Sequence, residues 1–413
     1  MIRWLIFFVI IGIADCYAFQ SLKTITKSNW WYTFYWLFTI GVLGNFMFQF
    51  YNFNRNNGFS PSNSFAVGML ITMVVPKLVL ILAMFGEDVF RIPQGIYSYF
   101  MQDSGGDSKI NHFPARRKFI SQIALGIAAI PFASVLFGIY KGKYNFKVLK
   151  YTLHFDDLPD AFNGYKLTQI SDVHSGSFDN INKVEYAIDL INEQKSDIIL
   201  FTGDMVNNKA TEMDPYIDIF KKLKAKDGMY SVLGNHDYGD YVHWNTKAEK
   251  NQNLRDLKVL QKDIGFDLLL NENRFIEKEG QRIALVGVEN WGIGGFKQAG
   301  DLKKASSNVH KDDFKILMSH DPSHWDAEVV KDSYHYHLTL SGHTHGMQFG
   351  IEIPGWFKWS PVKWRYKHWA GIYESLGQYI NVNRGFGYLA FPGRVGIWPE
   401  ITVIELKKGK KEA

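Results

Sequence analysis

The chain has 413 residues and a formal net charge of +5, and it is long enough for a full catalytic domain together with an additional region. So small an excess of positive charge does not indicate a nucleic-acid-binding surface. No Lys/Arg-rich block with interleaved aromatic residues supplies one either, so we expect no nucleic acid partner. The single cysteine, Cys16, excludes an internal disulfide.

The N-terminal third contains four long apolar stretches, at residues 4–19, 30–51, 65–85 and 119–140. Each approaches the ~20 residues that a bilayer-spanning helix needs. Tryptophan and tyrosine cluster at residues 30–36, as is typical of a membrane–water interface. No small-residue cleavage site follows the first stretch, so we expect a retained helix rather than a signal peptide. Residues 1–143 are therefore predicted to form a region with about four transmembrane helices, which makes the chain a multi-pass protein of the cell membrane.

The orientation of this region rests on a short basic segment. Basic residues flank the fourth stretch on both sides, so the positive-inside rule does not decide between the two orientations. Residues 116–120 (RRKFI) precede the stretch and resemble a twin-arginine export signal. We therefore expect the C-terminal domain to lie outside the cytoplasm. The alternative is that Arg116 and Arg117 simply mark a charged helix end.

Residues 144–413 are predicted to form a separate domain. Apolar runs at residues 165–170, 197–201 and 229–233 predict strands, and helices are predicted at residues 180–194 and 214–223. This alternation matches the spacing of βαβ units, so the sheet is expected to begin parallel.

Later in the chain the pattern changes to strands. A hairpin is predicted around residues 278–281, and further strands at residues 314–318, 337–340, 379–382 and 401–406. The fold class is therefore expected to be α/β, with two packed mixed sheets and helices on the outside.

Candidate metal ligands follow several of these strands. They are Asp172 and His174, Asp204, Asn235 with His236 and Asp237, and His320. Ligands bind at the carboxyl ends of strands in such sheets. Each residue alone is explained equally well as a turn-capping side chain. Their joint occurrence after apolar strands indicates a shared site.

A glycine-flanked turn adds two more candidates. His343 and His345 follow the strand at 337–340, with Gly342 and Gly346 on either side. Where strand geometry persists, residues two apart point to the same side. Imidazoles and carboxylates together are donors that transition metals favour.

In chain order, the motifs D-x-H, G-D, G-N-H-D, an isolated histidine and G-H-x-H resemble the calcineurin-like metallophosphoesterase family over about residues 151–406. The apolar leader and the segments at 383–387 (NRGFG) and 399–402 (PEIT) are similar to its YkuE/YaeI-type membrane-associated branch. The resemblance implies a four-layer αββα sandwich of two mixed β-sheets.

The resemblance also implies a two-metal site. One divalent ion would be held by Asp172, His174 and His345. The other would be held by Asn235, His320 and His343, with Asp204 bridging the two. Mn, Fe, Zn and Co all accept this donor set, and Mn is favoured. Two such ions lower the pKa of a shared water, which then attacks the phosphate.

Two further residues receive catalytic roles from the resemblance. His236 would act as general acid or stabilise the transition state, and Asp237 takes the place of the acidic residue that follows this histidine in the family. The family often carries a charged residue at the position of Asn207, so this position departs from the pattern. No protein nucleophile is expected, because Cys16 lies in the predicted membrane region.

The predicted function is that of a membrane-anchored, metal-dependent phosphoesterase acting on a phosphorylated small-molecule or lipid substrate, as a mono- or diester. One alternative is a pyrophosphatase of the UDP-2,3-diacylglucosamine hydrolase type, which normally acts on the cytoplasmic side. Another is a non-catalytic membrane sensor whose metals are structural.

An aromatic and basic segment at residues 354–369 follows the G-H-x-H turn. Trp, Tyr, Lys and Arg are typical of the bilayer interface, so we expect the substrate to be met at the membrane surface. A lid packed on the sheet edge is the alternative. Arg384 and Arg394 could clamp a phosphate, and the alternative for them is pairing with Glu400.

Overall fold

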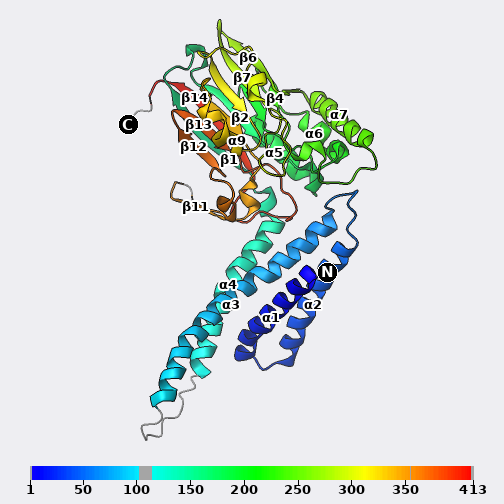
Figure 1. Ribbon diagram of the computed structural model, residues 1–413, viewed down its shortest axis with the longest axis vertical. Helices are drawn as coiled ribbons and strands as arrows, with labels where there is room; N and C mark the ends of the chain where they lie inside the picture. The colour runs from blue at the N-terminus through cyan, green and yellow to red at the C-terminus, as the bar shows by residue number, and fades with distance from the viewer. Residues whose placement is uncertain (1, 102–113, 354, 411–413) are drawn as a thin grey trace. The chain divides into compact units, whose positions relative to one another are not determined.

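The computed structural model describes residues 2–101, 114–353 and 355–410. The chain divides into two compact units (Figure 1). The first consists of Met1–Phe53 and Ser62–Phe137, and the second of Asn54–Pro61 and Gly138–Ala413. The predicted boundary after residue 143 falls in the segment that begins the main part of the second unit.

Four helices contribute to the first unit. They are α1 (Ile2–Ile25), α2 (Asn29–Tyr51), α3 (Pro61–Met101) and α4 (Pro114–Tyr140). Three spans in the described residues are long and apolar enough to cross a membrane: Ile6–Ile25, Pro61–Pro93 and Arg117–Tyr140. Helix α2 has 23 residues but is rich in Trp, Tyr and amide side chains, which lower its hydropathy. The number of membrane crossings therefore stays a prediction.

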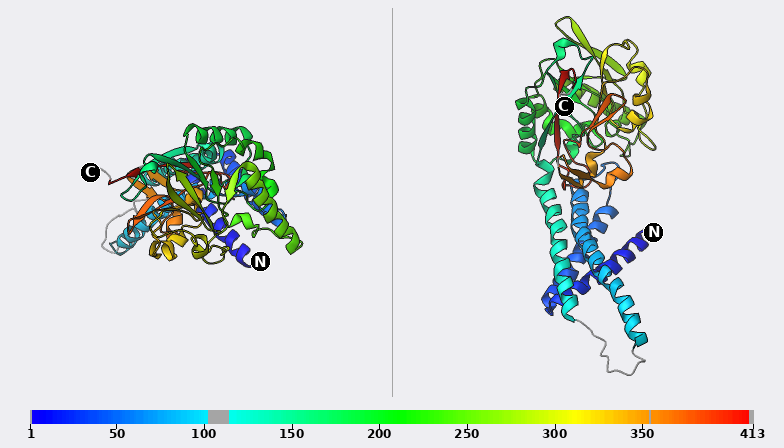
Figure 2. Two further views of the ribbon diagram at one scale, coloured as in Figure 1. Left: turned by 90° about the horizontal axis from the view of Figure 1, so that it is seen from above. Right: turned by 90° about the vertical axis from the view of Figure 1, so that its left-hand side faces the viewer.

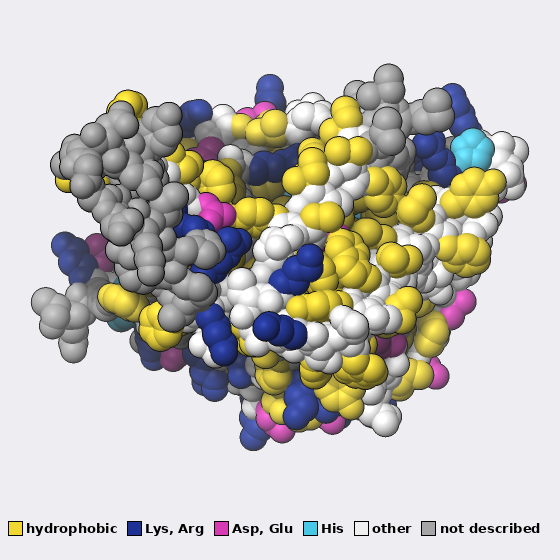
Figure 3. Space-filling model, turned by 90° about the horizontal axis from the view of Figure 1, so that it is seen from below, with side chains coloured by type: hydrophobic (Ala, Val, Ile, Leu, Met, Phe, Trp, Pro, Cys, Tyr) yellow, Lys and Arg dark blue, Asp and Glu magenta, His cyan; other side chains and the backbone are white. Residues whose placement is uncertain are grey.

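The first unit is apolar outside and carries a polar contact inside. Ile10, Leu37 and Leu82 are among many exposed large apolar side chains of these helices, and hydrophobic side chains are widespread on the face in Figure 3. Inside, Lys77 Nζ lies 2.5 Å from Asp15 Oδ1 and 2.8 Å from Thr39 Oγ1, which links α3 to α1 and α2. This pairing satisfies a buried lysine, as a membrane bundle requires.

The second unit contains two six-stranded sheets (Figures 1 and 2). The first has the order β1 (Lys147–Phe155), β14 (Glu400–Lys408), β2 (Tyr165–Ile170), β3 (Ile198–Phe201), β4 (Met229–Ser231) and β5 (Phe266–Leu268). The second has the order β12 (Gly371–Ser375), β13 (Gln378–Val382), β9 (Leu338–Ser341), β8 (Phe314–Met318), β7 (Gln281–Gly287) and β6 (Glu272–Lys278). Both sheets are mixed. In the first sheet, β2 to β5 run parallel and β14 is antiparallel to β2. In the second sheet, β7, β8, β9 and β13 run parallel, and the edge strands β6 and β12 are antiparallel to their neighbours.

Alternating side chains join the layers. In β3, Ile198 and Leu200 point into the core between the sheets, while Ile199 and Phe201 point into the core under the helices. This double burial is why β3 is a continuous apolar run. The first sheet is covered by α5 (Ile181–Glu193), α6 (Ile217–Phe220) and α7 (Lys247–Ile264). The second sheet is covered by residues of α8 (Leu302–Ala305), α9 (Ser323–Ala327) and their flanking loops. The predicted αββα architecture is confirmed.

Some predicted elements differ in extent. The helix expected at residues 214–223 is a 3₁₀ helix, Ala210–Tyr216, followed by the short α6. The cause is Glu212, whose carboxylate accepts the backbone N–H groups of residues 207–209 and so starts a turn earlier than Asp214. A small hairpin, β10 (Ile351–Ile353) and β11 (Phe357–Trp359), begins just before the aromatic segment and ends within it, where no strand was predicted.

Candidate metal centre

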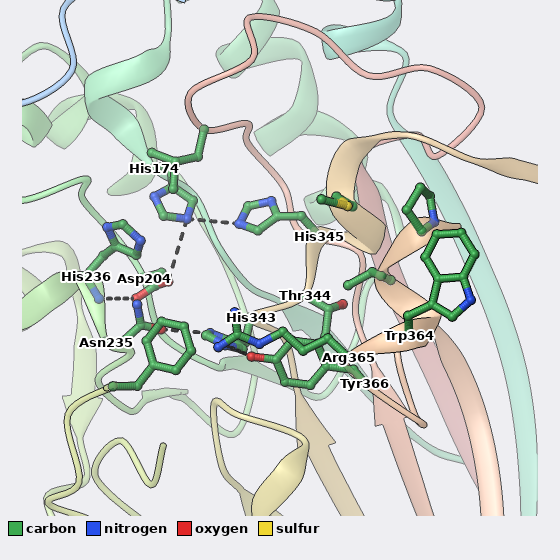
Figure 4. Close-up of a pocket in the computed structure, with 15 residues that line it drawn as sticks. His174, Asp204, Asn235, His236, His343, Thr344, His345, Trp364, Arg365 and Tyr366 are labelled. Atoms are coloured by element: carbon green, nitrogen blue, oxygen red, sulfur yellow. Dashed lines mark hydrogen bonds and ion pairs between the residues drawn. The ribbon is translucent and has the colours of Figure 1, made fainter. Parts of the chain in front are cut away.

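The seven predicted metal ligands converge in the second unit. Each follows a strand: Asp172 and His174 follow β2, Asp204 follows β3, Asn235 follows β4, His320 follows β8, and His343 and His345 follow β9. Both sheets therefore contribute from their carboxyl ends. Figure 4 shows most of them around one pocket, which has a volume of about 390 Å³.

The first group contains Asp172, His174 and His345. His345 Nε2 lies 3.1 Å from Asp172 Oδ1, and it lies 3.0 Å from His174 Nε2. All three side chains are buried. Two imidazole nitrogens and a carboxylate oxygen this close to one another are a suitable donor set for a divalent transition metal.

The second group contains Asp204, His320, His343 and Asn235. His320 Nε2 lies 3.1 Å from Asp204 Oδ2, and His343 Nδ1 lies 2.8 Å from Asn235 Oδ1. The same Asp204 oxygen is 3.6 Å from His174 Nε2 in the first group. Asp204 thus lies between the two groups, where a bridging carboxylate would be needed.

Hydrogen bonds behind the ligands fix their ring orientation. His320 Nδ1 donates to the carbonyl of Thr202 at 2.7 Å, which turns Nε2 towards Asp204. That Nε2 is buried and has no hydrogen-bond partner among the described residues. A buried imidazole nitrogen without a hydrogen-bond partner and beside a carboxylate is suited to bind a metal ion.

The electrostatics of the pocket favour added positive charge. Burial disfavours the charged form of His320, but Asp204 and Asp172 outweigh it and raise its pKa to about 10. Burial alone would raise the pKa of Asp172, yet His345 and His320 hold it below its ordinary value. Burial lowers the pKa of His343 to about 4, so this ligand is neutral at pH 7. Metal binding needs anionic carboxylates and neutral imidazoles, so a metal bound at this site would take the place of the proton that His320 holds.

The ligand turns have unusual backbone. Asp172, His174, Asp204, His343 and His345 have φ between 47° and 69°, in the left-handed region that non-glycine residues seldom adopt. Such strain clusters at functional sites because the surrounding fold enforces it. Five of the seven predicted ligands share it.

Two motif glycines, Gly342 and Gly234, are required because atoms of neighbouring loops lie too close to allow a side chain there. A Cβ on Gly342 would lie 1.9 Å from Ser171 Oγ and 2.2 Å from Asp172 Oδ2. A Cβ on Gly234 would lie 2.2 Å from Asp204 Oδ1. A side chain at either position would therefore displace a ligand carboxylate.

His236 stands at the pocket wall, where its backbone N–H donates to Asp204 Oδ1 at 2.8 Å. Its ring Nδ1 donates to the carbonyl of Asn207 at 2.8 Å, which leaves Nε2 for the pocket. Burial lowers the pKa of this ring. Asn207 departs from the family pattern in its side chain, but its backbone supplies the carbonyl that orients His236.

Asp237 contacts the ligand loops and not the ring of His236. Its carboxylate accepts the N–H groups of Asp204, Met205 and Gly234 at 2.8–2.9 Å. Burial, followed by the charge of Asp204, raises its pKa to about 7. Asp237 therefore holds together the loops that follow β3 and β4.

The two predicted phosphate-binding arginines lie outside the pocket lining. Arg384 is buried and pairs with Glu400 and Glu352, as in the alternative interpretation. Arg394 is fully buried; it donates to the carbonyls of Gly385 and Gly387, and its Nη2 lies 3.2 Å from His345 Nδ1. Arg394 thus supports the turn of His345, whereas Arg384 joins β14 to Glu352, just after that turn.

Tyr366 and Arg365 line the pocket without any signal in the motifs, and Asp321 approaches His343 from outside the pocket lining. Tyr366 Oη lies 2.7 Å from His343 Nε2, and Asp321 Oδ2 lies 3.7 Å from the same nitrogen. The guanidinium of Arg365 lies 5.0 Å from the ring centre of Phe296, and both residues line the pocket. The one available signal for Asp321 was its place beside His320, while Tyr366 and Arg365 lie in the aromatic and basic segment that was assigned to the membrane surface.

Comparisons with known proteins identify both parts of the chain. Residues 165–347 match the family profile of calcineurin-like phosphoesterases. Residues 2–143 match a profile described as the transmembrane domain of a probable calcineurin-like phosphoesterase.

Individual relatives extend the similarity. The chain is 31% identical to the uncharacterized metallophosphoesterase YkuE of Bacillus subtilis over 271 residues, which are 65% of this chain and 88% of that protein. It is 26% identical to the transmembrane protein with metallophosphoesterase domain of Danio rerio over 69% of this chain, and spans 62% of that protein. A metallophosphoesterase of Helicobacter pylori strain 26695 is 25% identical over 94% of this chain and 92% of its own length.

Proposed function

The chain belongs to the calcineurin-like phosphoesterase family, and from this premise we propose that it hydrolyses a phosphate ester with two divalent metal ions held by the seven converged ligands. It is a membrane-associated metallophosphoesterase, and therefore a hydrolase. The observation that carries the two-metal proposal is the position of Asp204, whose Oδ2 lies within 3.1 Å of His320 Nε2 and 3.6 Å of His174 Nε2.

The two ligand groups assign the metals as follows. Asp172, His174 and His345 would hold one ion; Asn235, His320 and His343 would hold the other; and Asp204 would bridge them. When bound, such ions lower the pKa of a water and offset the charge of the phosphate. We propose Mn as the favoured metal, with Fe, Zn and Co compatible with the same donors.

His236 would supply the proton for the leaving group. Because its Nδ1 donates to the Asn207 carbonyl, its Nε2 can donate only when the ring is protonated. An approaching phosphate dianion favours that protonated form. A protonated Nε2 in the pocket can then pass its proton to the departing oxygen.

Water rather than a side chain is the proposed nucleophile. The only hydroxyl-bearing threonine or serine in the described pocket lining is Thr344, and its hydroxyl donates to the Trp369 carbonyl at 2.7 Å. Cys16 lies in α1 of the other unit. A direct attack by water on phosphorus therefore fits the pocket best.

Location and substrate are further parts of the proposal. We propose that the catalytic domain lies outside the cytoplasm, on the strength of the RRKFI segment. Residues 102–113 and the side chain of Arg116 lie outside the described residues, so this rests on the sequence alone. A lipid-linked phosphate ester is the proposed substrate, because apolar residues such as Met347, Val362 and Leu389 line the pocket beside the ligands.

The test uses the full chain in detergent, stripped of metal with a chelator and reloaded with Mn, Zn, Fe or Co. Substrates should include a soluble monoester, a soluble diester, lipid-linked phosphates and UDP-2,3-diacylglucosamine. We expect hydrolysis that depends on added metal and is absent in Asp204→Asn. Chelator-resistant hydrolysis, or none with any metal, would contradict the proposal. Activity confined to the UDP-lipid, together with a cytoplasmic C-terminal reporter, would favour the pyrophosphatase alternative.

A further inference from the structure

The β10–β11 hairpin has an inverted distribution of polar and apolar side chains. Its register pairs Ile351 with Trp359, Glu352 with Lys358, and Ile353 with Phe357. Side chains directly opposite one another share a face, and successive residues alternate between faces. One face therefore carries only apolar side chains, and the other carries the charged pair.

The charged face is the one attached to the domain. Glu352 accepts hydrogen bonds from Arg384 Nε and Nη2 at 2.9 and 2.5 Å. Lys358 Nζ donates to the Ala370 carbonyl at 2.6 Å and contacts Tyr373 Oη at 3.1 Å. These bonds hold the hairpin with its polar side inward.

The apolar face is consequently exposed. Ile351, Ile353 and Phe357 are 55%, 45% and 47% exposed, and Trp356 in the turn is 80% exposed. A hairpin on a water-soluble domain would have the opposite arrangement, because an exposed apolar ribbon promotes aggregation. A contiguous apolar patch of this kind marks an interaction surface.

The root of the hairpin is joined to the end of a candidate membrane span. Gly350 N donates to the Val395 carbonyl at 2.9 Å, and Arg394 N donates to the Gly138 carbonyl at 3.2 Å. Gly138 is in the last turn of α4, whose residues Arg117–Tyr140 are long and apolar enough to cross a membrane. Within the second unit, two neighbouring-chain spacings, roughly 10 Å, thus separate the hairpin root from Gly138.

We propose that the apolar face of β10–β11 inserts into the lipid bilayer that α4 enters, with Trp356 at the level of the headgroups. Trp favours this level of a bilayer, and the exposed Lys363 and Lys367 in the following segment would contact anionic lipids. The Val395 N–H donates to the Gln348 carbonyl at 2.8 Å, and Gln348 ends the turn that begins at His345, just before β10 starts at Ile351. The hairpin therefore sets the metal centre beside the membrane surface, whether or not its substrate is a lipid.

The test measures depth in the full chain, reconstituted in nanodiscs that contain anionic lipid. Trp356→Cys in a Cys16→Ser background gives one labelling site for a nitroxide, since Cys16 is the only cysteine. The matched control is Leu376→Cys, which is 74% exposed in the β12–β13 turn. We expect the label at position 356 to be accessible to oxygen and several-fold less accessible than the control to a water-soluble nickel chelate.

Two results would overturn the proposal. One is equal nickel accessibility at positions 356 and 376. The other is protection of position 356 that appears only when a second protein co-purifies, which would make the face a protein-docking surface. Combined Ile351→Ser, Ile353→Ser and Phe357→Ser should restore nickel access while leaving the melting temperature unchanged, because the Glu352–Arg384 bonds remain. These readouts require no hydrolysis, so they stand or fall separately from the proposed function.

Discussion

Replacing His236 with alanine tests the proposed division between metal ligands and proton donor. The ring contributes one described hydrogen bond, to the Asn207 carbonyl, and packs against Tyr241 at a ring distance of 4.4 Å. Its loss leaves that carbonyl beside an open pocket where water can replace the ring, so we expect at most about 1–2 kcal/mol of destabilisation. Bound metal should be unchanged, because none of the seven proposed ligands is removed.

The expected loss of turnover is large but depends on the leaving group. Removing a general acid costs about 10²–10⁴-fold, which corresponds to roughly 3–5 kcal/mol of activation free energy. An alkyl phosphate needs the proton and should show this full loss. A p-nitrophenyl ester departs as a stable anion and should be affected much less.

The assay combines steady-state kinetics on both esters with elemental analysis of the purified variant. His310→Ala is the matched control, since His310 is an exposed histidine outside the pocket lining. Loss of metal from His236→Ala would refute the reasoning, because His236, Asp204 and His174 also lie close enough to form a metal site of their own. An equal loss with both esters would assign His236 to transition-state stabilisation instead of proton transfer.

Three further predictions concern the ligands and the core. Asp204→Asn and His343→Ala should abolish hydrolysis in a folded domain with reduced metal content; full metal and near wild-type turnover would contradict the two-metal assignment. Gly342→Ala should also lose metal, since its Cβ would stand 2.2 Å from Asp172 Oδ2. Gly280→Ala has open space around it but a φ of 74°, so it should cost about 1–2 kcal/mol of stability while retaining both metal and activity. Finally, His337 accepts the Lys315 amide at Nδ1 and contacts Asp157 through Nε2, and burial lowers its pKa to about 4. Below pH 6.5 the unfolded chain therefore takes up a proton on His337 that the folded chain does not. The free energy of unfolding should fall by up to roughly 3 kcal/mol as the pH drops from about 6.5 to 4. If the melting temperature of His337→Gln depends on pH in the same way as that of the wild type, this explanation is excluded.

The parts of the fold predicted correctly are those with strong local patterns. Strands β3 and β8 are short apolar runs because both of their faces are buried, and each ends at a ligand. Strand β1 was not predicted, and its residues are mostly exposed or half-buried. Its pairing, which begins with Lys147 opposite Glu400, joins segments far apart in the chain. The hydrophobic periodicity of a short segment does not indicate a partner strand so distant in the chain.

At the site, the sequence predicted which residues are candidates, but it did not predict which groups their side chains contact. The seven proposed ligands could be named because their motifs occur in the order found in the family that the chain resembles. The role of Asp237 could not be deduced, because the three amides that it accepts come from two different loops. One of the two carboxylate partners of Arg384, Glu352, likewise lies in a hairpin that the sequence did not predict. Side chains that act through tertiary contacts are ambiguous in a single sequence.

The backbone of the proposed ligand turns explains why one of the motif glycines is required. Left-handed φ costs an L-residue roughly 1–2 kcal/mol, so no local preference predicts it at Asp172 or His345. The fold enforces it through contacts such as the His343 N–H, which donates to both oxygens of Asp172 at 3.0 Å. That contact is possible only because Gly342 has no side chain to occupy the space between β2 and β9. Gly342 thus indicates, in the sequence, a close approach between two strands of different sheets.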